Sequence, residues 1–173
     1  KDKGTFDDYN LKTYLHTGHN YMENNIAERF MKKLHDGGAL YCYCVGAGNT
    51  WRKNAVFNDT DTYLLNPIYM DAGTDGAFLE GNVICAPGKV WDNNGSGANK
   101  WAAGMSKFPN PGKVEANWKN NLMNGDEIPA FPYMFNPPYK GVTPEYKALV
   151  KEILGKARER GGWLGDASPV GSE

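Results

Sequence analysis

The stretch from Asn24 to Gly48 constrains the fold most, because it joins the pattern of an amphipathic helix to two closely spaced cysteines. Asn25 and Glu28 have the spacing of a helix N-cap and its capping-box partner. Apolar side chains then recur every four positions, at Ile26, Phe30 and Leu34. Glycine ends helices readily, so Gly37-Gly38 marks a helix end. The sequence therefore predicts a helix between Asn25 and Gly37.

The residues after this helix alternate in the manner of a strand. In the run from Ala39 to Val45, Leu40, Cys42 and Cys44 would share one face of an extended segment. A helix that delivers two thiols to a glycine-rich turn is one pattern of a cofactor or metal site. The other interpretation is a buried strand in which cysteine serves as a small apolar residue.

Composition limits the class of protein. The chain has 173 residues and a net charge of −1, which gives no signal for nucleic-acid binding, and no apolar run reaches the roughly 18 residues that a membrane helix needs. Its 21 Gly, 10 Pro, 10 Tyr and 5 Trp favour long loops pinned by aromatic side chains, as in many exported proteins. The first residue, Lys1, fits a mature form after signal removal. We expect residues 1–173 to form a single domain without internal repeats, exported to a periplasmic or extracellular location.

The three cysteines leave the disulfide state open. Cys42 and Cys44 are too close in sequence to bridge each other well. In an oxidising compartment, the expected disulfide joins Cys85 to one of them.

Two other groups of residues have metal-ligand chemistry. His16 and His19 flank Gly18, and they can be read either as a metal-binding pair or as loop histidines at a helix end. Asp71, Asp75 and Glu80 lie in a glycine-rich segment with part of the spacing of a calcium loop. The carboxylates usual at positions 3 and 12 of that loop are missing, so the alternative is a glycine-rich turn.

The clearest helix signal lies near the end of the chain. Thr143-Pro144-Glu145 supplies an N-cap, a proline for the first turn and an acidic residue beside it. Apolar positions follow at helical spacing, at Tyr146, Leu149, Val150, Ile153, Leu154 and Ala157. A further helix is predicted from Val114 to Leu122, ended by Asn124-Gly125.

The order of these elements resembles the class I c-type cytochromes, especially those that accept electrons from methanol dehydrogenases. Similarity lies in Phe6-Asp7-Asp8, Tyr14 to Tyr21, the segment from Ile26 to Cys42, Asn124 to Phe131, and Gly141 to Glu145. The haem-attachment pattern Cys-x-x-Cys-His is absent, and Ile128 stands where the family has its axial methionine. The resemblance implies a mainly α, loop-rich, cytochrome-c-like fold. Candidate haem-binding residues are Cys42, Cys44, His16, His19, His35 and Met134.

An alternative fold is α+β, with one small sheet built around residues 39–46, 62–70 and 78–86. Three functions are compatible with the sequence, of which we favour the first and keep the other two as alternatives. The first is an exported accessory or electron-transfer-type protein that docks on a larger partner, such as a redox enzyme. The second is a thiol- or metal-dependent hydrolase that uses Cys42 or Cys44 with a histidine. The third is a carbohydrate-binding or hydrolytic protein that uses Trp91, Trp101 and nearby carboxylates.

Overall fold

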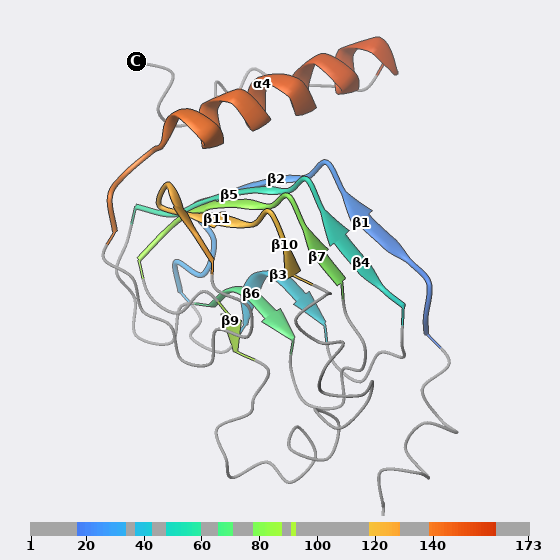
Figure 1. Cartoon of the computed structure of the whole chain (residues 1–173), viewed down its shortest axis with the longest axis horizontal. Helices are drawn as coiled ribbons and strands as arrows, with labels where there is room; N and C mark the ends of the chain where they lie inside the picture. Colours follow the sequence, from blue (N-terminus) through green and yellow to red (C-terminus); the bar gives the residue numbers. More distant parts are fainter. Residues whose placement is uncertain are drawn as a thin grey trace, which may run out of the picture.

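A computed structural model describes residues 17–33, 37–42, 48–59, 66–70, 78–87, 91–92, 118–128 and 139–161. Their dominant feature is a series of short parallel strands that succeed one another in a fixed order around a common interior (Figure 1). Each of the first three circuits of the chain adds one strand to each of three sheets, and the described part of the fourth circuit adds parallel strands to two of them. This is the architecture of a β-solenoid, in which each coil is a structural repeat that stacks on its neighbours.

The three sheets are named A, B and C here. Sheet A has the strand order β1 (Tyr21–Glu23), β4 (Thr50–Arg52), β7 (Phe78–Glu80) and β10 (Trp118–Lys119). Sheet B has the order β12 (Asp126–Glu127), β11 (Leu122–Met123), β8 (Val83–Cys85), β5 (Ala55–Phe57) and β2 (Ile26–Glu28). Sheet C consists of β3 (Gly38–Cys42), β6 (Asn66–Met70) and β9 (Trp91–Asp92). All pairings are parallel except that of β11 with β12, which closes one edge of sheet B.

A two-residue corner joins each strand of sheet A to the following strand of sheet B. The first corner residue has positive φ in every coil, at Asn24, Lys53, Gly81 and Asn120. The second is always asparagine: Asn25, Asn54, Asn82 and Asn121. A left-handed residue turns the chain sharply enough for both strands to stay short, and only glycine adopts it without strain.

The four corner asparagines form a continuous ladder of hydrogen bonds. The backbone N–H and the Nδ2 of Asn54 both donate to Oδ1 of Asn82, at 3.1 and 2.9 Å. The same pair of bonds joins Asn25 to Asn54 and Asn82 to Asn121. The second amide hydrogen of Asn82 goes to the Trp51 carbonyl of the preceding coil, at 2.9 Å. These bonds satisfy polar groups that are buried in the corner, where an unpaired one would cost roughly 1–3 kcal/mol.

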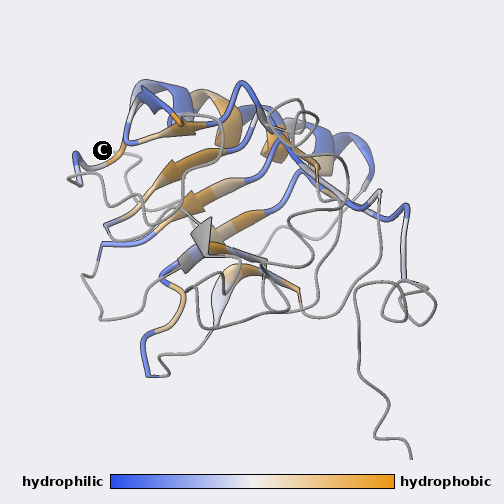
Figure 2. Cartoon of the chain, turned by 60° about the horizontal axis from the view of Figure 1, so that its bottom comes forward, coloured by the Kyte–Doolittle hydropathy of each residue, from blue (hydrophilic) through white to orange (hydrophobic). Residues whose placement is uncertain are grey.

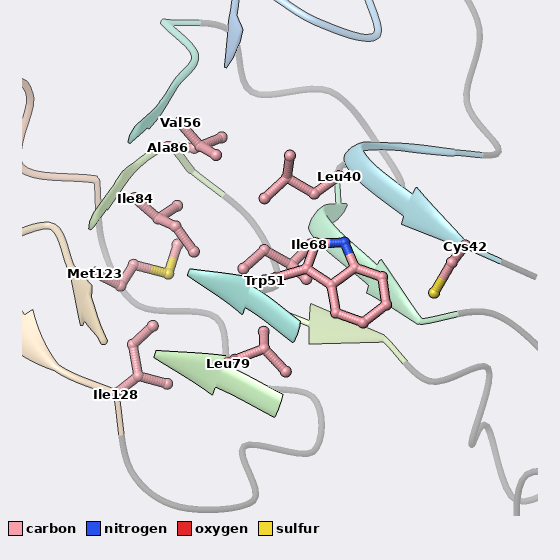
Figure 3. Packing of buried hydrophobic residues seen from close by; sticks show 10 residues of the cluster. All are labelled: Leu40, Cys42, Trp51, Val56, Ile68, Leu79, Ile84, Ala86, Met123 and Ile128. Atoms are coloured by element: carbon pink, nitrogen blue, oxygen red, sulfur yellow. The ribbon is translucent and has the colours of Figure 1, made fainter. Parts of the chain in front are cut away.

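Side chains from all three sheets fill the interior of the solenoid. In strands β1, β4 and β7 of sheet A the middle residues, Met22, Trp51 and Leu79, pack into the interior. Sheet B contributes Val56, Ile84 and Met123, and sheet C contributes Leu40 and Ile68 (Figure 3). The interior is therefore one apolar cluster, assembled from segments that are far apart in the sequence.

Helix α4 (Pro144–Glu159) covers the outer face of sheet B and is the only helix within the described ranges (Figure 1). The side chain of its N-cap, Thr143, accepts a hydrogen bond from the backbone N–H of Tyr146 at 3.2 Å. Its buried side chains pack against the outward residues of β5 and β8: Tyr146, Leu149, Val150 and Ile153 against Ala55, Phe57, Val83 and Cys85. In Figure 2 the hydrophobic colouring follows most strands, whereas the bends between them are hydrophilic.

The predicted mainly α, cytochrome-c-like fold is wrong. The segment from Asn25 to Gly37 is not a helix, because Ile26–Glu28 is strand β2 and Arg29 and Met31 have positive φ. Asn25 has the right spacing to Glu28 for a capping box, but its side chain instead bonds to Asn54 in the next coil, at 2.9 Å. That partner lies 29 residues away, so the local sequence around Asn25 does not reveal it.

The alternative α+β fold with one small sheet is wrong as well. Residues 38–42 and 66–70 do pair with each other, in sheet C. The segment 78–86 belongs elsewhere, because it supplies one strand to sheet A and one to sheet B. A helix is also predicted from Val114 to Leu122. The described part of this segment instead forms strand β10 and the start of strand β11, on either side of the corner at Asn121. The expectation of no internal repeats is also wrong, whereas the single domain of residues 1–173 stays a prediction.

Candidate functional site

The outer face of sheet A carries two rows of side chains that run across the strands. Successive residues of a strand point to opposite faces, so the first and third positions of each strand face outward while the middle one fills the interior. The first positions form the aromatic row, Tyr21, Thr50 and Phe78, in direct register. The third positions form the charged row, Glu23, Arg52, Glu80 and Lys119. These seven residues are called the sheet A face below.

The two rings of the aromatic row are exposed and regularly spaced. Tyr21 is 65% exposed and Phe78 is 41% exposed, although a large apolar ring is normally buried where packing allows. They lie on β1 and β7 with one strand between them, so their backbone positions are roughly 9.6 Å apart, twice the usual strand spacing. Thr50, between them, is small. The aromatic row therefore presents two separate rings rather than one continuous apolar patch.

The charged row is organised by Arg52. Its Nε donates to the Glu23 carboxylate on the neighbouring strand, and its guanidinium lies 4.8 Å from the centroid of the Tyr21 ring. The hydrogen bond from Arg52 lowers the pKa of Glu23 below its ordinary value, so Glu23 is ionised at neutral pH. A guanidinium over an aromatic face is an attractive cation–π geometry. Arg52 thus ties the two rows together and orients Tyr21.

The described cysteines do not form the predicted thiol site. Cys42 and Cys85 are both buried, and they lie in different clusters: Cys42 in the solenoid interior and Cys85 beneath α4. Cys85 carries a free thiol, so the disulfide expected between Cys85 and one of the other two cysteines does not form in this structure. Burial raises the pKa of the Cys85 thiol, which lies 3.7 Å from the Thr143 Oγ1. A neutral, buried thiol is a poor nucleophile.

The predicted ligands that the structure describes do not converge. His19 is an exposed bend residue with φ of 58°, packed so closely on Gly48 that a Cβ there would lie 2.5 Å from its Nδ1. Glu80 is exposed on the sheet A face. In the described part of the chain, no group of three or more His, Cys, Asp or Glu side chains could hold a metal ion. The other candidates, His16, His35, Cys44, Asp71, Asp75 and Met134, lie outside the described residues.

Sequence reasoning named Glu80 as a calcium ligand and missed the other members of the sheet A face. The available signal was an eight-residue pattern that recurs at 21–28, 50–57, 78–85 and 117–124. Its second position is apolar, its third is charged and its fifth is asparagine. Trp91, which was predicted to bind sugar, lies in β9 of sheet C, and Trp101 is outside the described residues.

Comparisons with known proteins assign no family. The sequence matches no protein-family model and no curated protein, and the fold matches no solved structure. No helix among the described residues is long and apolar enough to cross a membrane. Function must therefore be argued from the sheet A face itself.

Proposed function

We propose that this protein binds an extended carbohydrate chain on the sheet A face, without catalysing its cleavage. The observation that carries the proposal is the pair of exposed rings, Tyr21 and Phe78, held in register on one rigid sheet. The C–H faces of sugar rings are apolar and stack on aromatic rings, while their hydroxyl edges hydrogen-bond to charged and polar groups. The aromatic and charged rows offer these two kinds of contact side by side.

The linear form of the site favours a polymer over a folded protein partner. Cores of protein–protein interfaces are contiguous, and charged residues are depleted from them. Here Thr50 separates the two rings, and a complete row of charged residues lies beside them. A peptide that extends a sheet binds at an edge strand rather than across its face. A chain of sugar rings lying across the strands meets one row with its faces and the other with its edges.

Binding without cleavage fits the chemistry of the face. Glu23 is held as a carboxylate by Arg52, so it is a poor general acid at neutral pH. The two described cysteines are buried, which argues against a thiol hydrolase built on them. Export to a periplasmic or extracellular location, where such polymers occur, is part of this proposal. A larger protein partner stays a prediction without support from the described surfaces.

The test is equilibrium binding of the whole protein to a panel of soluble glycans, with Tyr21→Ala and Phe78→Ala as the informative variants. We expect each variant to weaken binding about tenfold or more, which corresponds to about 1.4 kcal/mol of binding free energy. Tyr41→Ala is the matched control, since Tyr41 is 44% exposed but lies on sheet C. Equal losses for all three variants, or no glycan binding by the wild type, would contradict the proposal.

A further inference from the structure

We infer that the sheet A face selects an uncharged glycan and discriminates against polyanionic ones such as polyuronates. This inference rests on the proposed function and specifies its ligand. It comes from the charges that border the aromatic row.

The charged row alternates in sign along its whole length. From β1 to β10 the third positions read Glu23, Arg52, Glu80 and Lys119, two carboxylates and two cations whose charges cancel. Alternation in register places each charge beside an opposite one, the arrangement that stabilises cross-strand pairs. The row itself therefore carries no net charge that would attract a chain of one charge sign.

The cation in the middle of the row is already neutralised. The Arg52 guanidinium is bonded to Glu23 on one side, and its pKa is raised chiefly by that bond, with a smaller contribution from the charge of Glu80. A uronate carboxylate placed at Arg52 would have to displace Glu23 and would still lie between two protein carboxylates. Like charges brought together at a binding site are a strong source of discrimination.

A neutral sugar polymer meets no such penalty. Carboxylates accept hydrogen bonds from hydroxyl groups, and the Arg52 and Lys119 side chains can donate to hydroxyl and ring oxygens. Alternating acceptors and donors therefore suit a ligand whose every hydroxyl can do both. The aromatic row supplies the stacking, and the charged row supplies the selectivity.

The experiment compares neutral hexasaccharides of glucose, xylose and mannose with a uronate hexasaccharide, by calorimetric titration of the whole protein at low and high salt. We expect the best neutral ligand to bind at least tenfold more tightly than the uronate. Its affinity should change less than twofold with salt, because screening acts mainly between charges. Glu80→Gln gives the row a net positive charge, so it should raise uronate affinity at low salt by several-fold and lose that gain at high salt.

The outcomes separate this inference from the proposed function. Tighter binding of the uronate, still weakened by Tyr21→Ala and Phe78→Ala, would overturn the neutral selectivity and leave the carbohydrate site in place. If neither Tyr21→Ala nor Phe78→Ala weakened binding, or if neither the neutral nor the uronate oligosaccharides bound, the site and the inference would be overturned together. An unchanged uronate affinity in Glu80→Gln, with its thermal unfolding as in the wild type, would contradict the charge argument alone.

Discussion

Sheets A and B are built from the same coils, and a two-residue corner is all that separates their strands, yet their outer faces differ completely. The outward residues of sheet B are apolar in the two central strands: Ala55, Phe57, Val83 and Cys85. The outward residues of sheet A form one row with two rings separated by Thr50 and a second row of charged side chains. Phe57 is 3% exposed and Phe78 is 41% exposed, although both are outward phenylalanines.

Helix α4 explains the difference. It lies across sheet B and buries that sheet's outer face, with the hydroxyl of Tyr146 donating to the Glu28 carboxylate at 2.9 Å. Glu152 forms an ion pair with Lys53 at 3.4 Å, which links the middle of the helix to a corner of the solenoid. Glu152 also pairs with Lys156 within the helix. The outer face of sheet B is therefore covered by the helix, whereas sheet A keeps the exposed rings of Tyr21 and Phe78. The comparison teaches that two equivalent outward positions in one repeat can have separate roles.

The largest expected effect comes from breaking the asparagine ladder that joins successive coils at the corner between sheets A and B. Asn82→Ala removes one hydrogen-bond partner from each of three buried groups: the backbone N–H of Asn54, its Nδ2, which keeps its bond to the Met22 carbonyl, and the Trp51 carbonyl. At roughly 1–3 kcal/mol each, we expect a loss of about 5 kcal/mol in the free energy of unfolding. Urea unfolding monitored by circular dichroism measures it.

Asn25→Ala is the control for this substitution. Asn25 lies at the exposed end of the same ladder, and its backbone N–H would still donate to Asn54. The expected loss is about 1 kcal/mol, the net value of one ordinary hydrogen bond. Equal losses at Asn25 and Asn82 would show that the ladder does not act through burial.

The second prediction sets the two outward phenylalanines against each other. Phe57→Ala opens a cavity beneath α4 beside Tyr146, whose ring centroid lies 5.8 Å from that of Phe57. We expect it to lower the free energy of unfolding by about 3–5 kcal/mol. Phe78→Ala removes a half-exposed ring, so its effect on unfolding should stay within about 0.5 kcal/mol. Similar losses for both variants would remove the distinction between the sheets.

The smallest expected effect is on the free energy of unfolding at low pH. The pKa of Glu152 is lowered, chiefly by its hydrogen bond to Lys156 and then by that to Lys53, and the pKa of Glu23 is lowered chiefly by Arg52. A carboxyl with a lowered folded-state pKa stabilises the protein above its ordinary pKa and loses that contribution as the pH falls below about 4. Because these pairs are exposed, Glu152→Gln should cost only a few tenths of a kcal/mol at pH 7 and less at pH 3. Urea midpoints at the two pH values test this, and an equal cost at both would refute the ionic origin.

The helix from Pro144 to Glu159 was predicted correctly from the sequence, and its signals explain why. Thr143, Pro144 and the apolar spacing from Tyr146 act within a few residues, so they can be read locally. The corner at Asn25 could not be read in this way. Its spacing to Glu28 also satisfies a capping box, and only its partner at Asn54 decides between strand and helix.

The same non-local character hid the candidate site. Tyr21 and Phe78 become neighbours on one face only when the coils stack, because β4 lies between their strands. Cysteine and histidine are common catalytic and metal-binding residues, but here Cys42 is an interior side chain and His19 is an exposed residue in a bend. Aligning the four asparagine corners first would have placed the two rings in one row.

The central claim is that the sheet A face, and not the rest of the surface, receives a carbohydrate chain. Titration of the isotope-labelled protein with the tightest-binding neutral oligosaccharide, followed by aromatic and methyl NMR spectra, tests it most directly. The account predicts saturable shifts at the rings of Tyr21 and Phe78 and at the Thr50 methyl group, with Phe57 and Tyr146 beneath α4 unchanged. Chemical-shift changes centred on Tyr41 or Tyr139, without changes at Tyr21 and Phe78, would contradict it.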